Sequence, residues 1–322
     1  MTTVMTIGGA RFMGRFTVEE FLRQGHDVTL FTRGQTPIPF DDSQINQIRG
    51  DRQNDDELQA AYDAVDPDVV IDFVAFHPDE VRTATELFSG IDAYVYISST
   101  HAYQRTATIP LREGKTPLEE YTGTDAYGPC KAEGDRIIFE AAEDGVNAIS
   151  VRPTAIYGPY DPTERQDYWI NRVNNYDRIV VPGDEYRMPI HLGYVEDAAK
   201  AIQLVAKEGV PGEAYNIASR SHLTYDDFIE LIAEALETSV DIVHATKKEL
   251  AAFDLSVTDF SLCEPYPYLV STEKLASLGW SSTPFEQGIQ NAVNDHLESD
   301  RDGQEYDIGR DTEVSLINEI QK

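Results

Sequence analysis

Apolar runs rich in β-branched and aromatic residues alternate with amphipathic segments along the first half of the chain. Six of these runs predict strands, which begin at Val4, Asp27, Ile45, Asp68, Ala93 and Asn147. Segments with helical periodicity separate them, over residues 12–24, 55–65, 78–88 and 127–143. Alternating strands and helices are typical of a parallel sheet with crossover helices. The pattern predicts an α/β fold built on a Rossmann-type, doubly wound parallel sheet, with a smaller C-terminal substrate-binding lobe.

The pattern changes after residue 158, where aromatic, arginine and turn residues replace the alternation. A strand and helix near 187–208 are expected to return to the sheet, and another helix is predicted over 225–237. We therefore expect an NAD(P)-binding domain at 1–158 with 187–208, a substrate-binding lobe at 159–186 and 209–298, and an acidic C-terminal tail at 299–322. This last segment is either a surface tail or a short docked helix.

Length and composition agree with a folded protein of one large domain or two closely joined domains, since the 322 residues are 41% hydrophobic. No apolar run approaches the roughly 18 residues of a membrane span, and no signal sequence precedes the first predicted strand. Two cysteines cannot build a disulfide framework or a metal site of their own, which fits a reducing compartment. These features predict a cytoplasmic protein without a metal or a membrane partner.

The chain is strongly acidic, with 57 Asp and Glu against 26 Lys and Arg and a net charge of −31. Such self-repulsion destabilises a compact state unless salt screens it. We expect a salt-adapted protein of the kind found in halophiles, although an acidic protein without environmental meaning stays open. The charge also argues against a nucleic-acid partner, because binding phosphates requires a basic surface.

A glycine-rich stretch, "TIGGARFMG", separates the first predicted strand from the first helix. Such a turn lets the backbone approach a pyrophosphate at the N-terminus of a helix. Gly8, Gly9 and Gly14 fit the spacing, but Arg11 stands where a middle glycine is usual. The loop alone is also compatible with tight strand–helix packing and no ligand.

Charged residues after the next two strands bear on the cofactor. Arg33 stands where an acidic residue usually binds the adenosine ribose, and an arginine there could bind a 2′-phosphate. Arg11 could reach the same phosphate or stack on the adenine. NADP is thus favoured over NAD, with a solvated turn as the alternative for Arg33. Asp51 could accept a hydrogen bond from the adenine amino group or be a plain turn residue.

The stretch "YGPCK" carries the strongest chemical signal. Tyr127 and Lys131 are four residues apart, so on a helix both side chains point to one site. Pro129 fits only the first turn of that helix, which Thr124 or Asp125 can cap. Tyrosine is a poor base at neutral pH, and a neighbouring ammonium favours its ionised form. Ser99, at the end of the fifth predicted strand, is the hydroxyl expected beside this tyrosine.

These stretches, with "VRPTAIYGP", "YNIAS" and "STEKLASLGWSSTPFEQGI", resemble the extended short-chain dehydrogenase/reductase family of the NAD-dependent epimerase/dehydratase type, up to about Val293. The resemblance implies a catalytic triad of Ser99, Tyr127 and Lys131, with Tyr127 as acid/base and Lys131 also binding the nicotinamide ribose. It further implies a homodimer. The cofactor contacts expected besides those already named are Phe12, Met13 and Pro153.

Departures from the family pattern limit the substrate prediction. Thr100 and His101 follow Ser99 where sugar dehydratases have an Asp-Glu pair, which disfavours dehydration. His101 is either a second proton carrier or a packed polar residue. Ala155 replaces an asparagine that holds the diphosphate of nucleotide sugars in many epimerases.

Other residues favour a phosphate-bearing or sugar-type substrate. Arg187 matches the family arginine that binds substrate phosphate, and Arg165 and Trp169 are expected in the pocket wall. The arginines could equally be structural ion-pair partners. The predicted activity is oxidation or epimerisation at a secondary alcohol of a sugar or nucleotide sugar, and the sequence leaves these two open.

The rival interpretation is a non-catalytic NAD(P)-binding or RNA-associated relative with the same fold. The "GGxRFxG" loop resembles that of atypical family members, including plastid RNA-binding proteins that have lost the tyrosine–lysine pair. This sequence keeps the pair, which favours an enzyme.

Overall fold

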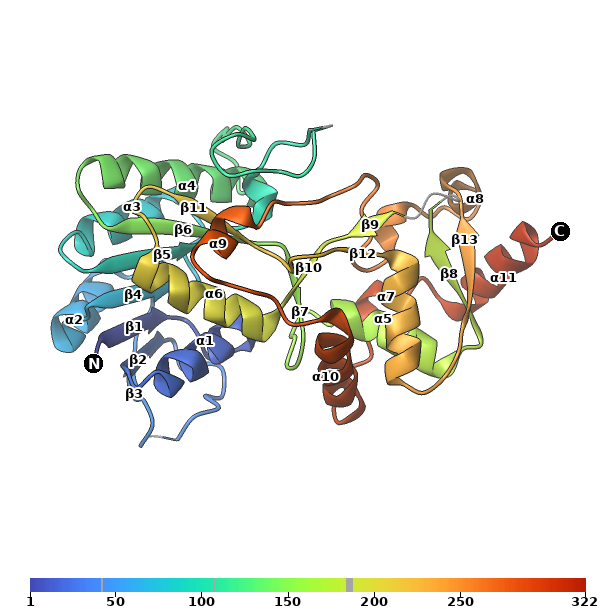
Figure 1. The fold of residues 1–322 in the computed structure, drawn as a ribbon, viewed down its shortest axis with the longest axis horizontal. Helices are drawn as coiled ribbons and strands as arrows, with labels where there is room; N and C mark the ends of the chain where they lie inside the picture. Colours follow the sequence, from blue (N-terminus) through green and yellow to red (C-terminus); the bar gives the residue numbers. More distant parts are fainter. Residues whose placement is uncertain (42, 107, 184–187) are drawn as a thin grey trace. The chain divides into compact units, whose positions relative to one another are not determined.

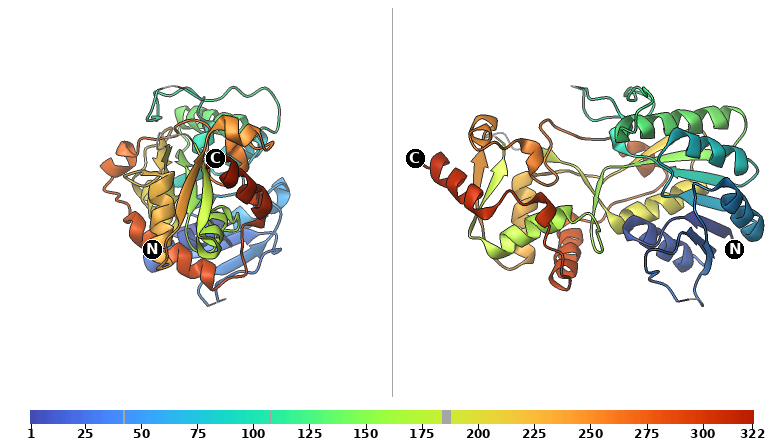
Figure 2. Two further views of the ribbon diagram at one scale, coloured as in Figure 1. Left: turned by 90° about the vertical axis from the view of Figure 1, so that its right-hand side faces the viewer. Right: turned by 180° about the vertical axis from the view of Figure 1, so that it is seen from behind.

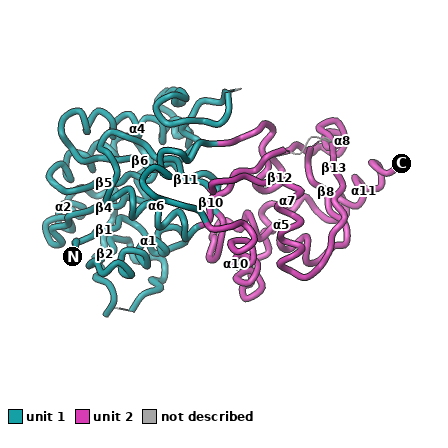
Figure 3. The backbone as a smooth tube through the Cα atoms, viewed as in Figure 1, with its two compact units in different colours: residues 1–156, 195–218, 270–282 teal, residues 157–194, 219–269, 283–322 magenta. Residues whose placement is uncertain are grey.

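Figure 1 shows the computed structural model of the protein, which describes residues 1–41, 43–106, 108–183 and 188–322. The chain divides into two compact units (Figure 3). The first unit comprises residues 1–156, 195–218 and 270–282, and the second comprises residues 157–194, 219–269 and 283–322.

A seven-stranded sheet forms the centre of the first unit, in the order β11-β6-β5-β4-β1-β2-β3 with every pair parallel. The strands are β1 (Thr3–Ile7), β2 (Asp27–Thr32), β3 (Asn46–Arg49), β4 (Val69–Asp72), β5 (Ala93–Ile97), β6 (Ala148–Pro153) and β11 (Ala214–Ile217). All five residues of β5 are buried, as expected of a strand that is covered on both faces. The Rossmann-type prediction is confirmed.

Helices cover both faces of this sheet (Figures 1 and 2). On one face, α1 (Phe12–Arg23) packs against α6 (Val195–Glu208). On the other, α2 (Asp55–Val65), α3 (Pro78–Leu87) and α4 (Tyr127–Glu143) share one hydrophobic cluster with the strands. A short helix, α9 (Glu273–Ser277), contacts β11. The four helices predicted in the first half all begin at the predicted residue and end within one residue of the predicted end.

The order of strands reverses at β1, which pairs with β2 on one side and with β4 on the other. In doubly wound sheets, ligands bind at such a switch point, outside the carboxyl ends of the strands. The glycine-rich stretch follows β1 directly and therefore lies at this point of the sheet.

Among its described residues, the second unit contains two small sheets and four longer helices. Strand β8 (Arg178–Pro182) pairs in parallel with β13 (Asp241–Ala245), and β9 (Pro189–Ile190) pairs antiparallel with β12 (Leu223–Thr224). The helices are α5 (Arg165–Asn175), α7 (Tyr225–Ala235), the short α8 (Lys247–Ala251), α10 (Phe285–Leu297) and α11 (Arg310–Ile320). Short strands β7 (Ala155–Tyr157) and β10 (Leu192–Tyr194) occur where the chain passes from one unit to the other.

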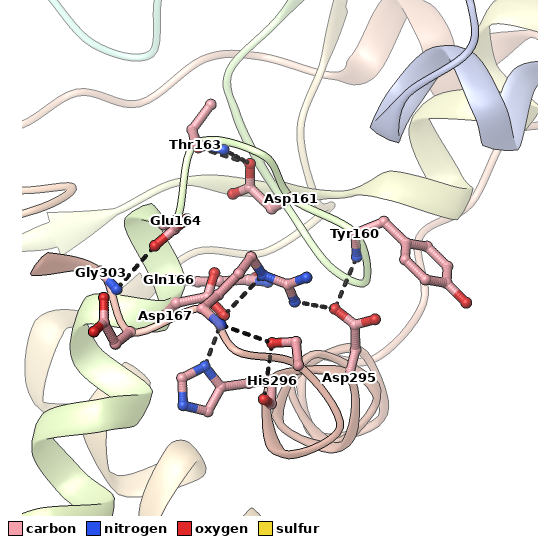
Figure 4. Close-up of polar contacts among 12 residues, drawn as sticks. Tyr160, Asp161, Thr163, Glu164, Gln166, Asp167, Asp295, His296 and Gly303 are labelled. Carbon is pink, nitrogen blue, oxygen red and sulfur yellow. Dashed lines mark hydrogen bonds and ion pairs between the residues drawn. The ribbon is translucent and has the colours of Figure 1, made fainter. Parts of the chain in front are cut away.

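Buried charges tie together distant segments of the second unit (Figure 4). The fully buried Asp167 of α5 contacts His296 Nδ1 of α10 at 2.7 Å, and Arg301 Nε reaches the same carboxylate oxygen at 3.3 Å. Arg301 also pairs with Asp295. Asp167 is the acceptor that His296 and Arg301 share, so its loss would remove both contacts at once.

Of the two forms expected for the C-terminal segment, the structure has the docked helix, because Leu316 and Ile317 of α11 are buried and Glu313 pairs with Arg172 of α5. The boundaries of the two units differ from the predicted ones. Residues 209–218 and 270–282 belong to the first unit, since β11 extends its sheet, whereas residues 188–194 belong to the second. None of the helices in the described residues has the length and apolar character to cross a membrane.

Candidate active site

A cavity of about 450 Å³ opens in the first unit at the switch point of the sheet. Its lining includes five residues expected at the cofactor, namely Gly8, Arg11, Gly14, Arg33 and Asp51. Phe12, Met13 and Pro153 are not part of this lining. The carbonyl of the buried Pro153 instead accepts a hydrogen bond from Thr100 Oγ1 at 3.2 Å.

The glycines of the loop are required by its geometry. Gly8 and Gly9 have φ values of +80° and +105°, and a side chain at Gly14 would collide with the backbone of Gly9. Arg11 caps α1 with an extended backbone, φ −131°, so its position does not need a glycine. The left-handed conformation falls instead on Phe12, with φ 42°. The arginine at the middle position is thus compatible with an open loop.

The two proposed catalytic hydroxyls belong to the first unit, one just after β5 and the other at the start of α4. Ser99 follows β5 and its Oγ accepts a hydrogen bond from the His101 amide at 3.1 Å. Tyr127 is the first residue of α4 and is 47% exposed. Its ring stacks on Phe76 and meets the His101 ring edge-on, with 6.0 Å between centroids in each pair. The phenol is therefore accessible to a ligand.

Lys131 is buried one turn into α4. Its ammonium donates hydrogen bonds of 2.8 Å to the carbonyls of Ala75 and Ile97, and it lies 4.8 Å from the centre of the Tyr96 ring. Burial lowers the pKa of Lys131 to about 8, although nearby carboxylates, Asp72 foremost, act in the opposite direction. This lysine is anchored by the backbone and easily deprotonated.

A buried ion pair beside the cavity was not foreseen from the sequence. Arg52, which lines the cavity and is 5% exposed, pairs with the fully buried Asp72 at 3.2 Å. The only signal in the sequence is an aspartate that ends an apolar strand. Its partner lies 20 residues away and follows no periodicity.

The predicted capping of α4 is wrong. Ala126 is the capping residue and makes no side-chain bond, while the Thr124 carbonyl accepts a bond from Cys130 Sγ at 3.3 Å. Asp125 instead faces His77 Nδ1 at 3.7 Å. Helix α4 begins without a polar cap, and its first buried residues are Cys130 and Lys131.

The residues expected in the substrate pocket are distributed differently from the prediction. Trp169 is fully buried in the second unit and its Nε1 donates to the Ser261 carbonyl at 2.8 Å. It is a core residue rather than a pocket wall, because the apolar face of α5 turns inward. Arg165 is half-buried, with its Nε bonded to Thr163 Oγ1 at 2.9 Å. Arg187 lies outside the described residues.

Comparison with known proteins agrees with this architecture. Residues 4–218 match the sequence profile of the NAD dependent epimerase/dehydratase family. The chain is 28% identical to the chloroplast stem-loop binding protein of 41 kDa b of Arabidopsis thaliana, over 90% of this chain and 78% of that protein. It is 26% identical to the low-salt glycan biosynthesis protein Agl12 of Haloferax volcanii, over 92% of this chain and 99% of the relative.

Solved structures share the fold. The dTDP-glucose 4,6-dehydratase of Bacillus anthracis in complex with NAD superposes with a TM-score of 0.74 and 21% identity, over 95% of this chain and 100% of that one. The profile match covers more than half of the chain. The protein belongs to the NAD-dependent epimerase/dehydratase family and is an NAD-dependent enzyme of the extended short-chain dehydrogenase/reductase type.

Proposed function

We propose that the protein is an NAD(P)-dependent oxidoreductase or epimerase that acts on a secondary alcohol of a sugar or nucleotide sugar. The observation that carries the proposal is the occurrence, in one unit, of the cavity at the switch point and of a helix that presents Tyr127 and buries Lys131. Relatives named for dTDP-glucose dehydration and for glycan biosynthesis support a sugar-type substrate.

The cavity suits the adenosine diphosphate half of a dinucleotide. The glycine loop leaves room for a pyrophosphate, and Arg11 and Arg33 add positive charge at the lining. Asp51, which also lines the cavity, is proposed to accept a hydrogen bond from the adenine amino group. Arg33 favours NADP over NAD, since a guanidinium can bind a 2′-phosphate through two hydrogen bonds.

A bound nicotinamide would supply the hydride acceptor. In the proposed mechanism, Tyr127 takes the proton of the substrate hydroxyl and Ser99 holds the substrate oxygen. Lys131 keeps a positive charge near Tyr127, and two of its three N–H groups bond to carbonyls, which leaves the third for a ribose hydroxyl. His101, beside the Tyr127 ring, is proposed as a substrate contact or second proton carrier.

The direct test follows reduced-nicotinamide absorbance with NADP or NAD over free sugars, sugar phosphates and nucleotide sugars. The buffer contains molar KCl, because the charge of −31 leads us to propose a salt-adapted protein. Net reduction with one substrate class would identify a dehydrogenase. A change of sugar configuration without net reduction would identify an epimerase.

Tyr127→Phe should lower turnover by about 10²- to 10⁴-fold, because it removes the acid/base group and little else. Cofactor affinity, measured by fluorescence quenching, should stay within about twofold. Tyr121→Phe, which removes a hydroxyl from another exposed tyrosine of the first unit, is the matched control and should leave turnover intact. Full turnover in Tyr127→Phe would contradict the proposal.

The alternative, a non-catalytic NAD(P)-binding or RNA-associated protein, is favoured by the name of the Arabidopsis relative. The net charge of −31 opposes RNA binding. Tight binding of a stem-loop RNA at physiological salt, measured by fluorescence anisotropy and unaffected by Tyr127→Phe, would support it. The homodimer and the cytoplasmic location remain predictions from the sequence.

A further inference from the structure

The turn between β4 and α3, residues 73–77, links the cavity to the proposed catalytic lysine within the first unit. Val74 lines the cavity, and the next residue, Ala75, accepts a hydrogen bond from Lys131 Nζ through its carbonyl. Any movement of this turn would therefore change both the wall of the cavity and the position of the ammonium.

Asp72, the last residue of β4, is hydrogen-bonded to the backbone of this turn. Its Oδ1 accepts hydrogen bonds from the amides of Val74 at 3.1 Å and Ala75 at 2.9 Å. Aspartates often hold a turn in this way, by bonding to amides two and three residues ahead. The two bonds fix the peptide planes on either side of Val74 and so hold the chain up to Ala75. The Ala75 carbonyl that receives Lys131 lies in the next peptide plane, whose amide, that of Phe76, donates to Glu80 Oε2.

Arg52 in turn holds Asp72. It bonds to Asp72 Oδ2 at 3.2 Å and donates to the Glu80 carbonyl, while Tyr94 donates its hydroxyl to the same Oδ2 at 3.2 Å. Within the described residues, Arg52 Nε has no hydrogen-bond partner. A buried guanidinium with an unused donor lowers the stability of the fold. We attribute its presence here to the contact with Asp72.

A second connection reinforces the first. Gln53 Nε2 donates to Glu80 Oε1 at 3.0 Å, and Glu80 Oε2 accepts from the amides of Phe76 and His77 at 2.7 and 3.0 Å. Since the Phe76 ring stacks on Tyr127, the residues that follow Asp51 are connected to both members of the tyrosine–lysine pair.

We propose that Asp72, held in place by Arg52, is a positioning residue for Lys131. It holds the backbone up to Ala75, whose carbonyl anchors the lysine, and places a negative charge near the ammonium. The inference rests on the proposed function of Lys131, but the position and ionisation of this side chain can be measured without turnover.

The charges around Lys131 indicate what such a measurement should show. Asp72 and Glu80 face it from the β4–α3 region, and Asp135 and Cys130 from α4 itself. The Tyr96 ring faces it from β5. Among the charged groups, Asp72 contributes most to raising the pKa of Lys131 against the effect of burial. Each carboxylate is paired with an arginine, Asp135 with Arg152 at 2.8 Å and Asp72 with Arg52 at 3.2 Å. Only Asp72 also bonds to the turn whose Ala75 carbonyl receives the lysine.

The experiment titrates Lys131 by NMR in the full-length protein labelled at lysine ¹³Cε, with its signal assigned by Lys131→Arg. The wild-type midpoint should lie near 8. Asp72→Asn should lower it by about one unit, because an opposite charge is lost while the side-chain shape is kept. An unchanged midpoint would overturn the inference and would mean that the ion pair is only structural.

Asp167→Asn is the matched control. Like Asp72, Asp167 is fully buried and lies within 3.3 Å of an arginine nitrogen, but it belongs to the second unit (Figure 4). It should leave the midpoint of Lys131 unchanged, and an equal shift in this variant would overturn the inference by showing a general effect of destabilisation.

A double variant covers the possibility that Asp72→Asn does not fold. Arg52→Met combined with Asp72→Asn removes both charges, so no buried arginine is left unpaired. The midpoint should again fall. In folded variants, the alkaline limb of the pH–rate profile should move with the NMR midpoint. If the midpoint moves but Lys131→Met retains turnover, the positioning stands and the proposed catalytic function of Lys131 fails.

Discussion

In the first unit, the buried carboxylate of Asp72 faces Arg52 and holds a turn beside Lys131. In the second unit, the equally buried carboxylate of Asp167 faces His296 and Arg301 and joins α5 to the end of α10. Both aspartates are fully buried beside an arginine. Only Asp72 bonds to a turn that contacts Lys131. The comparison teaches that a buried ion pair indicates function only where its partners also contact a cavity and a reactive side chain.

The largest expected effect is on the stability of the second unit. Glu313→Ala should lower the free energy of unfolding by about 3–5 kcal/mol, because Arg172 would remain buried without its buried partner and with only the exposed Asp307 at 3.2 Å. Urea denaturation measures the loss. Asp311→Ala, an exposed position of the same helix, should cost less than about 0.5 kcal/mol. Equal effects of the two substitutions would break the comparison.

The pH dependence of stability should depend on the first unit. The folded pKa of Lys131, about 8, is below its ordinary value of 10.5, so the unfolded chain binds the additional proton between these pH values. Stability should therefore rise with pH from about 8 to 10.5, by up to about 3 kcal/mol, relative to Lys131→Met. Denaturation at several pH values measures this difference. The Asp167→Asn variant should show the same rise of stability with pH. Loss of the rise in this variant would show that the effect does not come from the first unit.

Trp169→Phe tests the assignment of this residue to the core. The substitution leaves the Ser261 carbonyl without its donor and a small void, and should cost about 2 kcal/mol of unfolding free energy. Thermal denaturation measures the cost, and the KM for substrate should be unchanged. A raised KM with normal stability would return Trp169 to the pocket wall.

The smallest expected effect concerns an exposed charge. Arg33→Ala should weaken NADP binding about tenfold, or about 1.4 kcal/mol, and leave NAD binding unchanged. Isothermal titration calorimetry with both cofactors measures this. Arg82→Ala makes the same change of charge on the exposed face of α3 and should affect neither cofactor. An equal loss for both cofactors would show that Arg33 does not read the 2′-phosphate.

Local pattern was sufficient to predict six of the seven strands of the first unit, its four helices in the first half of the chain and the start of α4 at Tyr127. It did not predict β11, whose residues were assigned to the substrate-binding lobe. Strands buried on both faces and helices with one apolar face leave a clear periodicity. The residues that line the cavity were also predictable, because Gly8, Arg33 and Asp51 each follow a strand of the same sheet.

Tertiary packing decided the rest. Trp169 suggested a ligand contact by its type, but the inward face of α5 buries it. The acidic composition of the last residues left a surface tail and a docked helix both open, and only the contacts of Glu313, Leu316 and Ile317 decide for the helix. The connection from Arg52 through Asp72 to Lys131 joins three separate segments, and no spacing along the sequence encodes such a contact.

The position of β11 has a consequence for synthesis on the ribosome. Strands β1 to β6 have all been translated by residue 153, but the strand that pairs with the outer edge of β6 appears only at residues 214–217. Until then the nascent chain exposes an unpaired edge of parallel sheet, which can template aggregation. The first segment of the second unit, residues 157–194, is translated in the same interval, before residues 219–269 of that unit exist. Rapid, uninterrupted elongation through this interval should therefore favour the yield of folded protein.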